Sequence, residues 1–271
     1  MLRALAMMDS WPTSAVAIGV LDPRGRVHTR GPATWVTRLA SVTKVLFTYA
    51  LLVAIEEGTL ALDDPIGQPG ATVRHLLAHA GGYGFDGADP VAKPGTRRIY
   101  SNTAFELLGE VLTARSNMPT SAYVRDAVLE PLAMTATDLR GSPAHQAFGD
   151  VEDLLRFARE LERPTLLDRA TLTDATSVQF PGLRGVLPGF GIQNPMDWGL
   201  GFELHDRKSP HWMGETASPR AFGHFGGSGT YFMIDPDAHV AIACLTEHEF
   251  GPWAVSAWPA LNNAILAEVG A

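Results

Sequence analysis

The fold is decided by the stretch Arg38-Leu-Ala-Ser-Val-Thr-Lys44, which leads into an apolar run that ends at Glu57. Apolar residues recur in this run at helical spacing, so we predict a helix from Ser41 to Glu57, which Gly58 ends. Ser41 stands in the first turn of this helix, and Lys44 follows three residues later on the same face. The two side chains can therefore meet.

A serine and a lysine in this arrangement supply the parts of a nucleophile and its base. A free serine hydroxyl is a weak nucleophile and needs a base within hydrogen-bond reach. The helix N-terminus favours negative charge that develops nearby, and burial lowers the pKa of a lysine so that it can accept a proton. Random placement of the serines and lysines of this chain gives roughly 0.13 Ser-x-x-Lys matches. An ordinary helix start with a solvated lysine is the alternative at this point.

Strand-like segments lie towards both ends of the chain, and helical segments lie between them. Residues 15–21 and 26–29 form a hairpin pattern around the turn Asp22-Pro-Arg-Gly25. The strand-like segments of the last third are residues 198–204, 229–234 and 239–245. The further predicted helices are residues 2–9, 72–80, 102–116, 120–129, 152–161, 168–176 and 254–269, whereas residues 177–197 read as an extended loop. This order predicts a sheet assembled from the two end regions, with an inserted helical region.

Two further motifs carry groups that serine chemistry uses. In Tyr100-Ser-Asn102, the phenol can relay a proton or act as a base, and the amide supplies both a donor and an acceptor. In Gly223-His-Phe-Gly-Gly-Ser-Gly229, glycines precede a strand, where exposed backbone N–H groups can stabilise an oxyanion. Taken alone, Asn102 could instead cap the helix that follows it, and the glycines could form an ordinary turn.

Composition and charge exclude several classes of partner. The chain has 271 residues, of which 46% are hydrophobic and 18% are charged, as in an ordinary globular protein. Its formal net charge is −8 and it has no basic stripe, so we expect it to bind neither nucleic acid nor an anionic membrane surface. The single cysteine, Cys244, excludes an intramolecular disulfide and lies in an apolar run typical of a buried, inert thiol.

Signals for targeting and for metal binding are weak. Residues 1–9 contain too short an apolar stretch for a signal peptide, and no window approaches the ~20 apolar residues of a membrane span. We therefore predict a cytoplasmic protein. His75 and His79 lie four residues apart on a predicted helix but lack further ligands at diagnostic spacing, so we read them as structural and expect neither metal nor cofactor. A Gly-x-Ser-x-Gly nucleophile elbow is absent in its strand-turn-helix setting.

The three motifs in this order resemble the serine β-lactamase and penicillin-binding-protein superfamily. The similarity is greatest to the branch that holds class C β-lactamases, D-alanyl-D-alanine carboxypeptidases and related esterases, and it runs from about residue 15 to 247. Further segments that resemble this branch are Glu57-Gly-Thr-Leu-Ala-Leu-Asp-Asp-Pro65, Val73-Arg-His-Leu-Leu-Ala-His-Ala-Gly-Gly82, Pro94-Gly-Thr-Arg-Arg-Ile-Tyr-Ser-Asn102, Pro131-Leu-Ala-Met134, Trp198-Gly-Leu-Gly201 and Phe222-Gly-His-Phe-Gly-Gly227.

The resemblance implies an α+β fold with the site between two domains. Residues 1–60 and 198–271 would form an antiparallel sheet with flanking helices, and residues 61–197 a mostly helical domain. The implied roles fall on matching positions: Ser41 forms the acyl-enzyme, Lys44 takes its proton, Tyr100 passes a proton to the leaving group and later activates water, and Asn102 contacts the acyl side. His224 stands where relatives carry Lys or His on the strand that lines the site. The backbone N–H groups of Ser41 and Gly227 would together form the oxyanion hole. Gly226 precedes Gly227 and belongs to the same part of the site.

One departure from the family pattern bears on the substrate. Relatives that recognise a substrate carboxylate often carry a hydroxyl residue at the middle of the third motif, where this chain has Phe225. If the phenyl ring points into the site, a hydrogen bond to a carboxylate is lost and an apolar wall is gained. We therefore predict a serine hydrolase of a small neutral ester or amide, most of all a carboxylesterase. The alternatives are β-lactamase or D-alanyl-D-alanine carboxypeptidase activity, acyl transfer, and a non-catalytic relative that only binds acyl compounds; the oligomeric state stays open.

Overall fold

The central sheet has six strands in the order β2-β1-β11-β10-β9-β8. The computed structural model describes residues 2–270, so residues 1 and 271, which end the predicted sheet domain, lie outside the described residues. The strands are β1 (Val16–Leu21), β2 (Val27–Arg30), β3 (Thr37–Arg38), β4 (Asp138–Leu139), β5 (Ala147–Gly149), β6 (Gly185–Leu187), β7 (Gly191–Gln193), β8 (Glu203–Leu204), β9 (Phe222–Gly226), β10 (Thr230–Asp235) and β11 (Val240–Thr246). The α-helices are α1 (Thr43–Glu56), α2 (Val73–Leu77), α3 (Asn102–Ser116), α4 (Thr120–Val124), α5 (Val151–Glu162), α6 (Arg169–Ala175) and α7 (Pro252–Val269).

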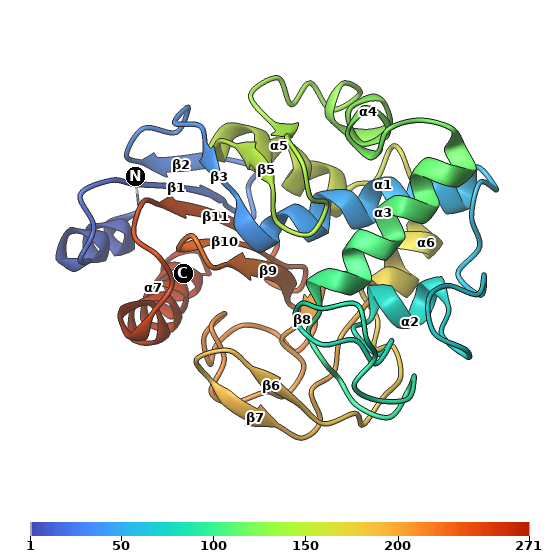
Figure 1. Cartoon of the computed structure of the whole chain (residues 1–271). Helices are drawn as coiled ribbons and strands as arrows, with labels where there is room; N and C mark the ends of the chain where they lie inside the picture. Colours follow the sequence, from blue (N-terminus) through green and yellow to red (C-terminus); the bar gives the residue numbers. More distant parts are fainter. Residues whose placement is uncertain (1, 271) are drawn as a thin grey trace.

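Segments from opposite ends of the chain meet in the middle of this sheet. Strand β1 pairs antiparallel with β11, so that Val16 lies opposite Thr246 and Leu21 opposite Ala241. The paired strands are coloured blue and red-brown in Figure 1, and they lie side by side. Both strands are buried along most of their length, as their continuous apolar runs predict. The predicted α+β fold with an antiparallel sheet is confirmed.

Helices cover both faces of the sheet (Figure 1). Because successive strand residues point to opposite faces, neighbouring residues of β10 contact different helices. The Tyr231 ring lies 5.0 Å from Trp258 of α7, and the Phe232 ring lies 5.8 Å from Phe157 of α5. The sheet therefore separates two hydrophobic clusters, one under α7 and the other shared by α5 and α1.

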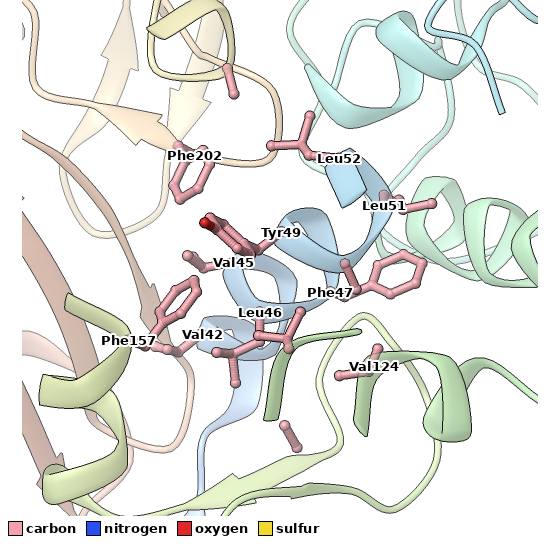
Figure 2. Packing of buried hydrophobic residues seen from close by; sticks show 14 of the residues in the cluster. Val42, Val45, Leu46, Phe47, Tyr49, Leu51, Leu52, Val124, Phe157 and Phe202 are labelled. Carbon is pink, nitrogen blue, oxygen red and sulfur yellow. The ribbon is translucent and has the colours of Figure 1, made fainter. Parts of the chain in front are cut away.

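Helix α1 is buried on all sides, which explains why its sequence is almost wholly apolar. Figure 2 shows side chains from other segments around it, with Phe157, Phe202 and Val124 on different sides. The helix predicted from residue 41 divides in two, because residues 40–42 form a 3₁₀ turn and the α-helix begins at Thr43. Ser41 therefore lies in the 3₁₀ segment that precedes α1, while Lys44 lies in the first helical turn of α1 itself.

Two predicted helices differ in type, because residues 3–10 form a 3₁₀ helix and the predicted helix 120–129 continues beyond Val124 as a π-helix. The other differences lie in short strands. The predicted loop 177–197 contains the hairpin β6–β7, and residues 198–204 form a strand only in β8. The three-stranded sheet β3-β5-β4 was not predicted. These strands are two or three residues long, too short for a periodic pattern, and their formation depends on contacts distant in sequence.

The six strands of the central sheet come from residues 16–30 and 203–246. Helix α5, within the range assigned to the helical domain, packs on this sheet through Phe157. The division of the chain into two domains therefore stays a prediction. Within residues 2–270, no helix combines the length and the apolar character needed to cross a lipid bilayer.

Candidate active site

Ser41 lies in a 3₁₀ turn whose backbone is constrained from both sides. The preceding residue, Ala40, has a φ of 45°, in the left-handed region that costs a residue with a Cβ about 1 kcal/mol or more. Thr230 of β10 holds the turn by donating from Oγ1 to the Leu39 carbonyl oxygen at 3.0 Å. The sheet thus fixes the position of Ser41, the predicted nucleophile.

Strand β9 approaches this turn so closely that only a glycine fits at its end. A Cβ on Gly226 would lie 2.6 Å from the Leu39 oxygen and 2.9 Å from Ala40 Cβ. A Cβ on Gly227, in contrast, would meet no described atom within 4 Å. The close approach brings the strand end that carries the Gly227 N–H towards the turn that carries the Ser41 N–H. These are the two predicted oxyanion donors.

Lys44 is a fully buried amine with two hydrogen-bond acceptors. Its Nζ donates to Asn102 Oδ1 at 2.7 Å and to the Ala144 carbonyl oxygen at 2.9 Å, and it lies 4.7 Å from the centre of the Tyr100 ring. Burial lowers the pKa of this amine well below its usual range, against the opposing effects of Glu106 and Asp86. Neither acceptor is a carboxylate, so the amine can lose its proton and act as a base.

Tyr100 is a neutral phenol beside Ser41. Burial raises the pKa of the phenol above its usual range, while the Ser41 hydroxyl lies near enough to lower that pKa in part. The Tyr100 hydroxyl is buried and makes no hydrogen bond of standard geometry within residues 2–270. A protonated phenol of this kind can donate to an oxygen that enters the site.

Asn102 does not cap the helix that it begins. Ser101 is the N-cap residue of α3, and its hydroxyl accepts from the Ala104 N–H at 3.0 Å. The Asn102 amide is therefore left to the site: Oδ1 accepts from Lys44, and Nδ2 donates to Asp86 Oδ1 at 3.2 Å. These two partners fix which way the amide points.

His224 lies on β9 with its ring 5.5 Å from that of Tyr100. Its Nδ1 is 2.7 Å from the Phe225 carbonyl oxygen, so Nδ1 carries the proton. Burial, followed by the charge of Lys44, lowers the pKa of His224 to about 4. The imidazole is therefore neutral at pH 7, and the third motif supplies no cation to a substrate carboxylate.

Phe225 lies on the opposite face of β9 from His224. Its ring packs 4.8 Å from Phe250 and 5.8 Å from both Trp212 and Trp258, in the cluster under α7. The Phe225 ring therefore does not point into the site, because alternation along the strand turns this ring away from Tyr100. It does not form the apolar wall that was considered from the sequence. The neutral state of His224 is the feature of the third motif that bears on substrate charge.

The family model described as Beta-lactamase matches residues 11–265. The chain belongs to the Beta-lactamase family. Its members include the serine β-lactamases and penicillin-binding proteins, so the predicted resemblance is confirmed, and the chain is a hydrolase of this superfamily.

Two relatives and one structural neighbour illustrate what the chain is similar to. A crystal structure of a β-lactamase, Mb2281c from Mycobacterium bovis, is 48% identical, with a TM-score of 0.96 over 98% of this chain and 99% of that one. A protein of Escherichia coli K12 provisionally assigned as a D-alanyl-D-alanine carboxypeptidase is 24% identical, and the match covers 79% of this chain and 69% of the relative. EstCE1, described as a hydrolase with promiscuous acyltransferase activity, is 18% identical with a TM-score of 0.80 over 97% and 96%, which shows the fold alone.

Two residues of this Beta-lactamase family site were not identified from the sequence. His79, read there as structural, is buried with a φ of 53°, and its ring lies 4.5 Å from that of Tyr100. Its Nδ1 accepts from the Ser101 N–H at 3.1 Å, so His79 helps to position the Tyr-Ser-Asn segment. Asp86 lies in the glycine-rich loop before α3 and reaches Asn102 only through the fold. Neither His79 nor Asp86 lies at a fixed sequence spacing from the three motifs, so no signal in the sequence indicated that they belong to the site.

Other parts of the structure lie outside this site. A hollow of about 1030 Å³ is lined by α5, α6 and the strand ends around Ile234, and by none of the predicted site residues. Among residues 2–270, no three side chains of histidine, cysteine, aspartate or glutamate gather in a way that would hold a metal ion.

Proposed function

We propose that the chain hydrolyses small neutral esters through an acyl-enzyme on Ser41. The observation that supports this most is the amine of Lys44, which is fully buried and bonded to an amide and a backbone carbonyl oxygen. An amine held in this way has a lowered pKa and can take the proton of a nearby serine.

The proposed reaction moves each proton between named groups. Ser41 Oγ attacks the ester carbonyl carbon while its proton passes to Lys44, and the Ser41 and Gly227 N–H groups stabilise the oxyanion. Tyr100, a protonated phenol, donates to the departing alkoxide as the acyl-enzyme forms. The Tyr100 phenolate then takes a proton from water, which attacks the acyl carbonyl carbon, and the Lys44 ammonium returns its proton to Ser41 Oγ as the acyl C–O bond breaks and the acid leaves.

The charge state of the site favours a neutral substrate. His224 is uncharged at pH 7 because burial depresses its pKa to about 4. Carboxylates Asp86 and Glu106 lie near enough to Lys44 to raise its pKa. A substrate carboxylate would therefore meet neutral or negative groups here and would be repelled by the negative ones. A neutral ester has no such charge to be repelled.

The test is an activity panel with a matched variant. We expect short p-nitrophenyl esters to be hydrolysed faster than nitrocefin or a D-Ala-D-Ala peptide. Ser41→Ala should remove the activity, by about 10³-fold or more, and should also abolish labelling by a fluorophosphonate. Ser10→Ala, an exposed serine, is the control and should behave as the wild type. Ester hydrolysis that survives in Ser41→Ala would refute the assignment, and a wild type that no acylating probe labels would favour a binding protein.

A second candidate is β-lactam hydrolysis. It is favoured by the Mycobacterium bovis structure that is 48% identical and is described as a β-lactamase. The same panel separates the two, because efficient nitrocefin turnover with slow ester turnover would select this candidate. Acyl transfer is distinguished by adding an alcohol or amine acceptor and measuring the transfer product.

A further inference from the structure

Asp86 lies in a loop that is tied to the start of α3. The Asn102 N–H donates to the Phe85 carbonyl oxygen at 2.7 Å, and Thr103 Oγ1 donates to the Gly87 oxygen at 3.0 Å. The Phe85 side chain is 57% exposed, yet its ring stacks on Tyr100 at 5.9 Å with 26° between the planes. These contacts on either side hold Asp86 at the edge of the site.

A chain of hydrogen bonds joins Asp86 to the proposed base. Asp86 Oδ1 accepts from Asn102 Nδ2 at 3.2 Å, and Asn102 Oδ1 accepts from Lys44 Nζ at 2.7 Å. The Asn102 amide can point only one way between these partners, since a carboxylate accepts and an ammonium or amine donates. The same amide is the group predicted to contact the acyl side of a substrate.

The Asp86 carboxylate keeps capacity for a further contact. It is exposed, it forms no ion pair within residues 2–270, and one of its oxygens is used by Asn102. The other charges that act on Lys44 do not cancel it, because Glu106 is also an acid and His79, His145 and His224 have lowered pKa values. The acyl side of the site is therefore bordered by negative charge.

We propose that Asp86 is a specificity-determining residue that selects substrates by the charge of their acyl group. Neutral acyl groups and acyl groups that carry an amine are accepted next to the Asn102 amide, whereas acyl groups that carry a carboxylate are rejected by like-charge repulsion. The inference rests on the proposed ester hydrolysis and names its substrate class.

The experiment compares two substrates of similar length in three proteins. The substrates are p-nitrophenyl valerate, which is neutral, and mono-p-nitrophenyl glutarate, which carries a carboxylate. The proteins are the wild type, Asp86→Asn and Asp89→Asn. Asparagine at 86 keeps an oxygen that can accept from Asn102 Nδ2 and removes only the charge. Asp89 is an exposed carboxylate of the same loop and serves as the matched control.

We expect Asp86→Asn to raise the ratio of kcat/KM for the glutarate over that for the valerate by about fivefold or more at low salt. The gain should shrink at 0.3 M salt, because screening weakens charge repulsion. Asp89→Asn should leave the ratio unchanged. The inference is overturned if Asp86→Asn leaves the ratio unchanged, or if Asp89→Asn raises it equally.

Failure of the ester reaction has its own signature. If the wild type turns over neither ester, the proposed function fails, and the rates at which the two esters acylate Ser41 are then read by intact mass. A preference for the valeryl group that Asp86→Asn reduces supports the charge selection even then. Equal acylation rates in all three proteins, or no acylation at all, overturn it.

Discussion

The state of a single amine decides what this site can do. Lys44 is held by an amide oxygen and a backbone carbonyl oxygen, and no carboxylate of residues 2–270 forms a hydrogen bond with it. Burial is the largest influence on its pKa and lowers it, and Glu106 is the first of the two groups that oppose this effect. The balance between burial and these acids sets the pH at which the amine becomes a base.

Replacing Glu106 by glutamine should shift the pH profile of kcat/KM. Glu106 raises the pKa of Lys44, so its removal lowers that pKa, and the acid limb should move to lower pH. Above the limb, the rate should stay the same. Glu110→Gln, one turn further along α3 and exposed, is the control and should leave the limb in place. A limb that moves to higher pH in Glu106→Gln would contradict this assignment of the base.

At the residue scale, the sequence was informative where groups follow a fixed spacing. Ser41 and Lys44 lie three apart at a helix start, and Tyr100 and Asn102 flank the residue that caps α3. The structure brings these four residues together. Asp86 could not be found in this way, because its place beside Asn102 depends on how a loop folds back on α3. The face of β9 on which Phe225 lies depends likewise on the register of this strand in the sheet. The His-x-Gly motif does not specify that register.

At the scale of elements, the contact between β9 and the turn before α1 positions the proposed oxyanion donors. Gly226 makes this contact possible, since a Cβ there would lie 2.6 Å from the Leu39 backbone oxygen, which accepts a hydrogen bond from Thr230. The neighbouring Gly227 has free space around it. The two adjacent glycines therefore differ in what they do.

Gly226→Ala should damage activity much more than Gly227→Ala does. The added methyl group of Gly226→Ala pushes β9 away from the Ser41 turn, so kcat should fall by about 10²-fold and the free energy of unfolding by about 1–3 kcal/mol. Gly227→Ala retains its N–H and meets no described atom, so its loss should be several times smaller. Steady-state kinetics and urea denaturation measure both effects. Equal losses in the two variants would show that the close approach does not matter.

Long elements were predicted well and short ones poorly. Helices α3, α5 and α7 begin and end within two residues of the predicted bounds, because their apolar periodicity extends over three turns or more. Strands of two or three residues, such as β3 and β4, carry no such signal and exist because their partner β5 is held beside them. Local sequence alone does not determine them.

At the scale of the whole molecule, Cys244 reports on the core of the sheet. It lies in β11 between Ile18 of β1 and Tyr231 of β10, and it is fully buried. Burial raises the pKa of its thiol above the usual range, so the reactive thiolate is scarce in the folded protein.

Cys244 should react with a thiol reagent only when the whole sheet opens. In a urea series at pH 8, the midpoint for labelling with 5,5′-dithiobis(2-nitrobenzoate) should coincide with the midpoint of the circular dichroism transition. Cys244→Ser is the control and should show no labelling. Rapid labelling without urea would mean that β11 opens locally, and the sheet would then not behave as one cooperative unit.

The pairing of β1 with β11 has a consequence for how the protein is made. On the ribosome, β1 and its hairpin partner β2 are made before β11, which pairs with the other edge of β1 and ends at Thr246. At about 5–20 residues per second, that edge waits roughly 10 to 50 seconds for its partner. During this time an apolar strand is open to pairing with other nascent chains, so aggregation during synthesis should depend on translation speed and on chaperones. Ser41 is likewise made long before β9 can complete its surroundings, so activity should appear only after residues 222–227 have been translated.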